Sequence, residues 1–250
     1  MESRAPQASR PSSLPFIIQR MIRIREITDV QDPALKAAYA LLKRSFHVDE
    51  RVELREWKSS LKEQADGLIT DMVWHLLVAE QDGRVIGLNS GTFIGSINLG
   101  MIGYLAIDDD ARSLGLGTRL RNRLRRLFTK DALRVSGKPL GGILGEVSER
   151  NPWLRTLARR PNVLALDFPY FQPSLAAGDA PTSFVLYWEQ LDHVRQRIPV
   201  RELRQVLYAI WRRAYRISRP LECVAFRAMM RALKDRRTIG RRTLTVLETS

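Results

Sequence analysis

The pattern of apolar and polar positions predicts that strands and helices alternate along the first half of the chain. Residues 21–27 (MIRIREI) alternate apolar and charged side chains, which is typical of a half-exposed strand. Asp32 and Pro33 offer a cap and a first-turn proline for a helix that ends near Phe46. A second helix is predicted over about 52–64.

A hairpin is predicted next. The apolar run 75–80 (HLLVAE) is followed by a short turn, QDGR, and by a second strand over about 85–94. An Asp-Gly pair between two apolar runs is a strong hairpin signal. Another apolar strand is predicted over 101–107 (MIGYLAI).

The following segment predicts a helix between two parallel strands. Its apolar side chains fall on one helical stripe with arginines between them: Leu116, Leu120, Leu124, Leu127 and Phe128. The next strand is predicted over 140–147 (LGGILGEV), and strand, helix, strand in this order indicates a crossover between parallel strands. A short helix after Asn151 and a late strand over 184–189 (FVLYWE) complete this region.

The C-terminal region has a helical pattern. An amphipathic helix is predicted over about 200–211, a second helix over 221–234 after the interruption at Arg219-Pro220, and a closing strand in RRTLTVLE. We therefore divide the chain into a disordered leader (1–20), a domain (21–192) and a basic, mainly helical extension (193–250).

Composition narrows the class of protein. The chain has 250 residues, 44% of them hydrophobic, and no apolar run approaches the roughly 18 residues that a membrane span needs. Cys223 is the only cysteine, which excludes an intrachain disulfide and a cysteine-based metal cage. The N-terminus lacks the apolar stretch of a secretory signal. We expect a cytoplasmic protein that does not bind membranes.

Positive charge is concentrated at the C-terminus. The net charge is +14, and residues 195–250 hold 15 Lys/Arg against four Asp/Glu, a net of +11. Such a tail could attract nucleic acid or another anionic partner. The alternative is that arginine simply occupies solvated helix faces, which we favour because no arginine-aromatic nucleic-acid motif accompanies the charge.

The glycine-rich segment 112–118 (RSLGLGT) lies where a strand gives way to a helix. The first amides of a helix are unpaired and partly positive, and glycines let an anion approach them. Arg112 and the Thr118 hydroxyl could share in binding a phosphate. The P-loop is excluded because no lysine follows Gly117, and the dinucleotide fingerprint is excluded because Leu120 stands where a third glycine is needed. The alternative is that the glycines serve tight packing alone.

In this context the segment resembles the GNAT superfamily of N-acetyltransferases. The central GNAT signature, Arg/Gln-x-x-Gly-x-Gly/Ala, is matched by Arg112, Gly115 and Gly117 in YLAIDDDARSLGLGTRL. The downstream strand with Glu146-Val147, Asn151 and the upstream hairpin also match, so that the resemblance covers roughly 23–188. It implies a mixed α/β fold: a central mixed sheet with splayed parallel strands, flanked by helices.

The resemblance also implies a cofactor site and a reaction. The co-substrate would be acetyl-CoA or another acyl-CoA, with no metal, and an amine of a small molecule or peptide would attack the thioester directly. Backbone groups of Leu105, Ala106 and Ile107 would bind the pantetheine, and Asn151 would bond it as well. The pyrophosphate would be held by Arg112 and by the amides of Ser113, Leu114, Gly115, Leu116, Gly117 and Thr118.

The acid and base cannot be assigned from the family pattern, because the chain departs from it. Ala158 stands where many relatives have a proton-donating tyrosine, Gly103 and Tyr104 stand where some have a glutamate, and Asn162-Val163 replaces a Gly-Phe pair. Our catalytic candidates are Glu146, at the expected mouth of the cleft, and Tyr170, in DFPYFQPSL. The alternatives are a solvated strand-end charge and a tyrosine packed on the sheet. The three histidines lack metal-ligand spacing, and His75 is expected to be structural.

Two functions remain open at this point. The first is transfer of an acetyl or other acyl group to an amine. The second is a catalytically weak GNAT-like binding module whose basic tail docks on nucleic acid or an anionic partner. The apolar stripes of the tail helices require burial, either on the body of the protein or in a homodimer.

Overall fold

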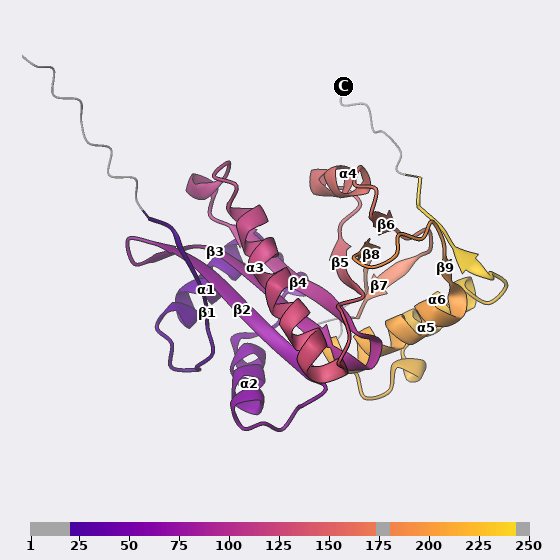
Figure 1. The fold of residues 1–250 in the computed structure, drawn as a ribbon, viewed down its shortest axis with the longest axis horizontal. Coiled ribbons are helices and arrows are strands. Elements are labelled where there is room, and N and C mark those ends of the chain that lie inside the picture. The colour runs from indigo at the N-terminus through magenta and orange to yellow at the C-terminus, as the bar shows by residue number, and fades with distance from the viewer. Residues whose placement is uncertain (1–20, 174–180, 244–250) are drawn as a thin grey trace, which may run out of the picture.

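The computed structural model describes residues 21–173 and 181–243 (Figure 1). In chain order the helices and strands are β1 (Arg23–Glu26), α1 (Ala34–Ser45), α2 (Leu54–Ala65), β2 (Met72–Gln81), β3 (Arg84–Ile94), β4 (Leu99–Ile107), α3 (Leu116–Asp131), β5 (Gly142–Val147), α4 (Pro152–Ala158), β6 (Val163–Ala165), β7 (Tyr170–Gln172), β8 (Thr182–Gln190), β9 (Ile198–Pro199), α5 (Val200–Ala209), α6 (Val224–Ala232) and β10 (Thr238–Ile239).

The main sheet is mixed, as the sequence predicts. Its strand order is β1-β2-β3-β4-β5-β8-β6, with β7 also paired to β8. Only β4 and β5 are parallel among these pairs, and α3 connects them. The hairpin of β2 and β3 is confirmed: Gln81 pairs with Arg84, and the two turn residues, Asp82 and Gly83, have φ of 50° and 77°. Positive φ at both positions matches the twist of the flanking strands.

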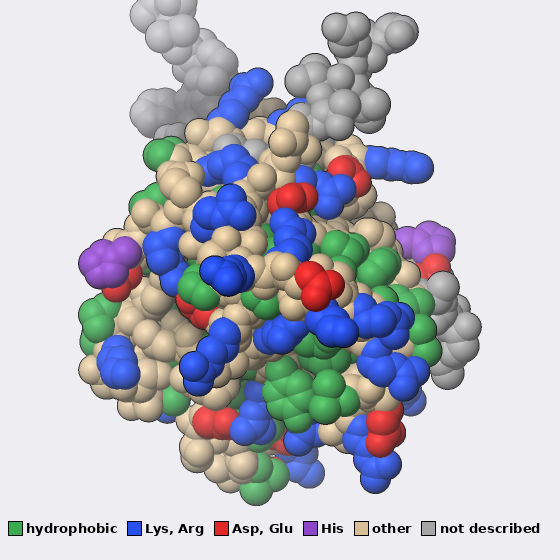
Figure 2. Space-filling view, turned by 90° about the vertical axis from the view of Figure 1, so that its right-hand side faces the viewer, with side chains coloured by type: hydrophobic (Ala, Val, Ile, Leu, Met, Phe, Trp, Pro, Cys, Tyr) green, Lys and Arg blue, Asp and Glu red, His purple; other side chains and the backbone are tan. Residues whose placement is uncertain are grey.

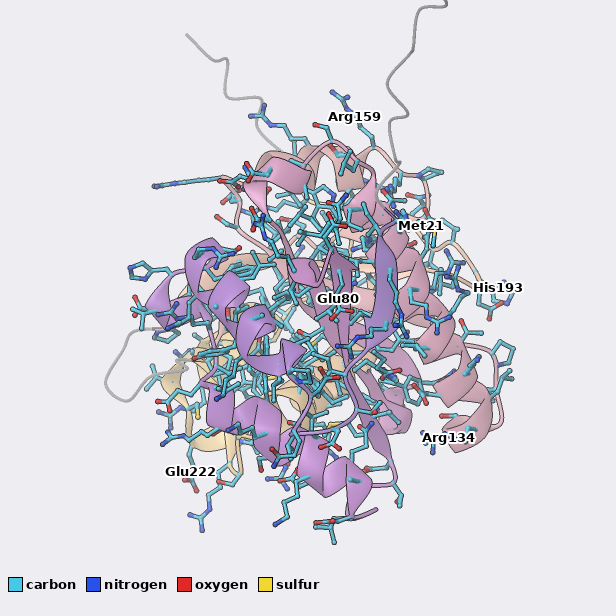
Figure 3. All side chains as sticks on the ribbon, turned by 90° about the vertical axis from the view of Figure 1, so that its left-hand side faces the viewer. Met21, Glu80, Arg134, Arg159, His193 and Glu222 are labelled. Atoms are coloured by element: carbon cyan, nitrogen blue, oxygen red, sulfur yellow. The ribbon has the colours of Figure 1, made fainter. Side chains whose placement is uncertain are left out.

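The two faces of the first four strands carry different helices. Leu76 and Val78 of β2 pack with α1 and α2, whereas Leu77 and Ala79 pack with α3. This division follows from the alternation of side chains along a strand. Figure 3 shows the result, with the purple helices and the pink helix on opposite sides of the strands.

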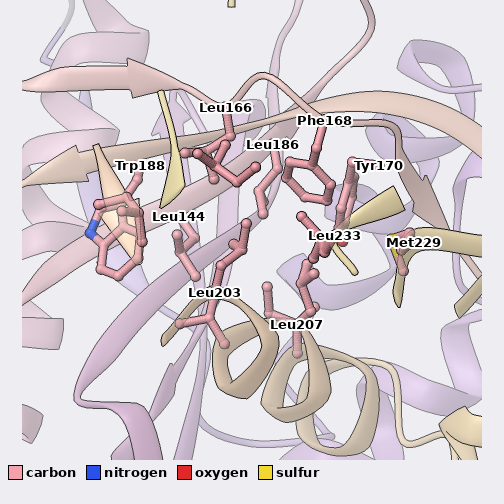
Figure 4. Packing of buried hydrophobic residues seen from close by; sticks show 14 of the residues in the cluster. Leu144, Leu166, Phe168, Tyr170, Leu186, Trp188, Leu203, Leu207, Met229 and Leu233 are labelled. Carbon is pink, nitrogen blue, oxygen red and sulfur yellow. The ribbon is translucent and has the colours of Figure 1, made fainter. Parts of the chain in front are cut away.

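The C-terminal helices pack on the other half of the same sheet. Leu203 and Leu207 of α5 and Met229 of α6 lie in one buried cluster with Leu144 of β5 and Leu186 of β8 (Figure 4). The domain division at residue 193 stays a prediction. Burial of each of these apolar side chains stabilises the folded protein by roughly 1.5–3 kcal/mol, so the extension is packed onto the body of the protein.

The sequence patterns miss the shortest elements. The three-residue strands β6 and β7 and the two-residue strands β9 and β10 were not predicted. The second C-terminal helix begins at Val224 rather than at 221, because Pro220 begins a separate 3-10 turn (Pro220–Glu222). The leader 1–20 and residues 244–248 of the predicted closing strand (241–248) lie outside the described residues. Within the described ranges, no helix has the length and apolar character to cross a bilayer.

Candidate active site

A cleft opens where β4 and β5 separate. The two strands pair in parallel from Leu99 to Ile102 and from Gly142 to Gly145, and both continue past the last pair. Beyond Ile102 the register of β4 against β3 shifts, so that Ser90 alone faces Gly103 and Tyr104. Such a bulge bends its strand, and here it occurs where β4 parts from β5.

The cleft has a volume of about 1150 Å³. Its walls are residues 103–108 of β4 and its continuation, residues 145–148 of β5 and its continuation, the start of α4, the segment between α1 and α2, one face of α2, and residues 213–216 of the extension. This volume exceeds the range of about 300–1,000 Å³ that is usual for small-ligand pockets. It suits two substrates bound together.

The start of α3 follows shortly after Arg112, which lines the cleft. Ser113 and Gly115 have φ of 70° and 65°, and this left-handed backbone turns the chain into the helix. The first helical hydrogen bond that spans the turn joins the Arg119 amide to the Gly115 carbonyl (3.2 Å). No side chain among the described residues caps this N-terminus, and residues 112–115 are exposed. The amides at 116–118 therefore have the geometry to donate to an anion at a positive helix end.

The glycines at this turn leave room for a ligand. A Cβ atom added at Gly115 would meet nothing within 4 Å, and one at Gly117 would meet only the Cδ2 atom of Leu105, at 3.9 Å. The space over the helix start is therefore open, and Gly117 adjoins the β4 wall of the cleft. The alternative that these glycines serve tight packing has no support in these distances.

The remaining cofactor candidates all line the cleft. Leu105, Ala106 and Ile107 line the cleft, on the stretch of β4 beyond its last pair with β5. Arg112 also lines it, and its guanidinium is exposed and 2.6 Å from Asp109. Asn151 caps α4, accepting a hydrogen bond from the Trp153 amide (3.0 Å). Residues 113–118 are not part of the lining and follow Arg112 directly in the chain, at the helix start.

Glu146 stands on the β5 wall, held by two tyrosines. The Tyr170 hydroxyl donates to its Oε1 and the Tyr215 hydroxyl to its Oε2. Burial raises the pKa of Glu146 to about 7, although both hydrogen bonds act to lower it. A carboxyl that titrates near neutral pH beside a cleft is suited to act as a general base.

The two tyrosines differ in how far their side chains are exposed to the cleft. Tyr170 is 1% exposed, packs in the cluster of Figure 4 and does not line the cleft. Its hydroxyl reaches Glu146 from the interior. Tyr215 is half-buried and lines the cleft. Burial and the Glu146 charge raise the pKa of each tyrosine well above its usual value, so both remain protonated donors at neutral pH.

Sequence reasoning missed Tyr215. It follows a π-helical turn (Ile210–Ala214) and lies 69 residues from Glu146 in the chain. Its setting, RRAYRIS, carries no motif, so no local signal could have identified it. Tyr104, at a position where some relatives have a glutamate, holds the segment before α2 in place. Its hydroxyl donates to the Glu50 carbonyl (3.1 Å) and accepts from the Val52 amide (3.0 Å).

Comparisons with known proteins agree with this fold. Residues 35–136 match a family model described as the acetyltransferase (GNAT) family. A protein from Bacteroides thetaiotaomicron assigned to that family is 17% identical, with a TM-score of 0.57, and the match covers 78% of this chain and 99% of that one. A protein from Staphylococcus epidermidis assigned as an acetyltransferase is 12% identical, with a TM-score of 0.50 over 68% and 99%. No curated protein matches the sequence.

Proposed function

We propose that this chain, which has the GNAT fold and matches the GNAT acetyltransferase family over residues 35–136, transfers an acetyl or other acyl group from acyl-CoA to an amine. One observation carries the proposal: Arg112, just before the open helix start, and Glu146, a carboxyl with a pKa of about 7, line the same cleft. An anion site next to a cleft that also holds a base is what this reaction requires.

The cofactor half of the cleft would hold the acyl-CoA. The amides of residues 113–118 and the Arg112 side chain would bind the diphosphate, and the free edge of β4 at Leu105–Ile107 would pair with the pantetheine in the manner of an added strand. Asn151 retains its side-chain NH2 group for the same ligand, because its cap uses only the oxygen. When bound, the acyl-CoA supplies an activated thioester carbonyl.

The transfer would proceed by direct attack in a ternary complex. The ionised Glu146 accepts a proton from the ammonium form of the acceptor, which frees the nitrogen lone pair. The C–N bond forms, the C–S bond breaks, and the leaving thiolate takes up the second proton that the nitrogen gives up as it becomes an amide; Glu146 returns its own proton to solvent. Tyr170 does not line the cleft, so we assign it to positioning Glu146 rather than to contact with substrate. We place this reaction in the cytoplasm, in keeping with a single unpaired cysteine.

Amine-dependent release of CoA thiol tests the proposal. Purified protein is given acetyl-CoA and a panel of small and peptide amines, with Glu146→Gln as the matched control. We expect at least one amine to raise thiol release far above the rate without amine, and Glu146→Gln to abolish that increase. Wild-type protein that binds acetyl-CoA but responds to no amine would contradict the transferase proposal.

A second function, anion docking by the extension, has one supporting observation. Lys and Arg side chains are spread over the face of the C-terminal half (Figure 2). Several are already neutralised within the molecule, as in Arg195–Glu202, Arg236–Asp167 and Arg242–Glu149. Others are exposed with no ion pair among the described residues, such as Arg204 and Arg227. If this surface binds nucleic acid, affinity for a short duplex should fall steeply as salt rises.

A further inference from the structure

Residues 213–216 of the extension are fixed against the wall of the cleft. The Arg213 guanidinium lies 2.5 Å from the Asp71 carboxylate at the start of β2. Arg216 bridges to α2, with its guanidinium 2.8 Å from Glu63 and 3.0 Å from the Ser60 hydroxyl. Arg216 also has a φ of 56°, a conformation that non-glycine residues adopt rarely. Charged contacts on both sides therefore hold this turn in place.

A buried anchor precedes the turn. Trp211 is 1% exposed and its ring packs edge-on against that of Phe226 of α6, with centroids 5.2 Å apart. The Ile217 amide, beyond the turn, donates to the Trp211 carbonyl (2.9 Å). The residues on both sides of the turn are thus fixed by the buried Trp211. Tyr215, between them, lines the cleft from a fixed position.

Glu146 accepts hydrogen bonds from hydroxyl groups of two separate elements. Tyr170 donates from β7, and Tyr215 donates from the extension. No cation among the described residues forms an ion pair with it. Its orientation and its ionisation therefore depend on tyrosine hydroxyls, and only one of the two donors, Tyr215, lies in the cleft wall.

We propose that Tyr215 is a positioning residue for Glu146, and that the C-terminal extension is therefore a structural part of the active site. This inference rests on the proposed acyl transfer. Because both oxygens of the carboxylate accept a hydrogen bond, the plane of the carboxylate is fixed. Its remaining lone pairs therefore keep one orientation relative to the cleft. Hydrogen bonds from a hydroxyl also favour the ionised carboxylate, which is the form that accepts a proton.

Replacement of Tyr215 by phenylalanine tests this role. Tyr215→Phe removes one oxygen atom and keeps the ring, and Tyr208→Phe is the matched control, since Tyr208 is 45% exposed on α5 of the same extension. The titration of Glu146 is followed by ¹³C NMR of glutamate-labelled protein, with the signal identified by its loss in Glu146→Gln. This measurement needs no amine.

We expect the Glu146 midpoint to move to higher pH in Tyr215→Phe and to stay in place in Tyr208→Phe. With an active amine, kcat at pH 7 should fall about three- to tenfold in Tyr215→Phe, recover as the pH is raised, and leave the KM for acetyl-CoA unchanged. A merely structural tyrosine would not move the pH profile. An unchanged midpoint in Tyr215→Phe would overturn the inference.

A second variant covers the case in which Tyr215→Phe does not fold. Site-specific 3-fluorotyrosine at position 215 keeps the hydroxyl and makes it a stronger donor, so the Glu146 midpoint should move to lower pH; no movement would refute the role. Failure of the proposed function looks different, because it would appear as wild-type protein whose release of CoA thiol responds to no amine, whatever the Glu146 midpoint does.

Discussion

Raising the pH from 7 to 10 should destabilise this protein through one buried histidine. The His75 ring of β2 is 5% exposed and lies between two carboxylates, with Nδ1 2.6 Å from Glu26 of β1 and Nε2 2.6 Å from Asp131 of α3. Burial lowers the pKa of His75, but the hydrogen bonds to Asp131 and Glu26 outweigh it and raise the pKa to about 9. The charged imidazolium thus joins β1, β2 and α3.

The size of the effect follows from proton linkage. The pKa of His75 is about 9 in the folded protein and 6.5 in the unfolded chain, so the folded state binds the proton more tightly. The resulting stability is fully present below pH 6.5 and is lost as the pH rises through 9. At about 1.4 kcal/mol per tenfold difference in proton affinity, this group contributes about 3 kcal/mol to the free energy of unfolding.

Urea unfolding between pH 6 and pH 10 measures this contribution. Tyrosines and lysines also titrate near pH 10, so the informative quantity is the difference between wild type and His75→Gln. Wild type should lose about 3 kcal/mol more than His75→Gln over this range, with most of the loss near pH 9. Parallel curves for the two proteins would refute the charged-histidine account.

Three further predictions concern the site and the core. Glu146→Gln should lower kcat about 100-fold or more while acetyl-CoA affinity, measured by calorimetry, is retained, because the base is lost and the anion site is not. In wild type, kcat/KM should fall as the pH drops through 7, where Glu146 takes up a proton; a flat profile would argue against a carboxyl base. Gly100→Leu should destabilise the fold by several kcal/mol in chemical denaturation, because even a Cβ atom there would lie 2.2 Å from the Phe128 ring; wild-type stability would show that α3 can shift.

Local patterns were sufficient where structure and chemistry are local. The strand, turn and helix around Gly115 could be predicted because an apolar strand, two glycines and a leucine stripe follow one another directly in the chain. The hairpin of β2 and β3 was predictable for the same reason. These segments contain the proposed cofactor residues, which is why that half of the site could be described in advance.

The proposed catalytic half of the site depends on long-range contacts that no local sequence pattern predicts. The sequence makes Glu146 and Tyr170 candidates, but their bond arises only when β5 and β7 come together on β8. Tyr215 joins them from the extension, whose sequence pattern indicates only a basic, mainly helical appendage. Strands of two or three residues, such as β7, are too short to show a period of two, so the elements that deliver these hydroxyls are not visible in the sequence.

Calorimetric titration with acetyl-CoA tests the central claim most directly. Gly117→Trp is the variant to test. A Cβ atom fits at this position, 3.9 Å from Leu105, so the backbone tolerates a side chain, and the indole ring would fill the space over the helix start. Thr129→Trp, at an exposed position near the far end of the same helix, is the matched control. The account predicts that wild type and Thr129→Trp bind acetyl-CoA and that folded Gly117→Trp does not bind at millimolar concentration. Equal affinity in all three proteins would show that the diphosphate does not bind at the start of α3.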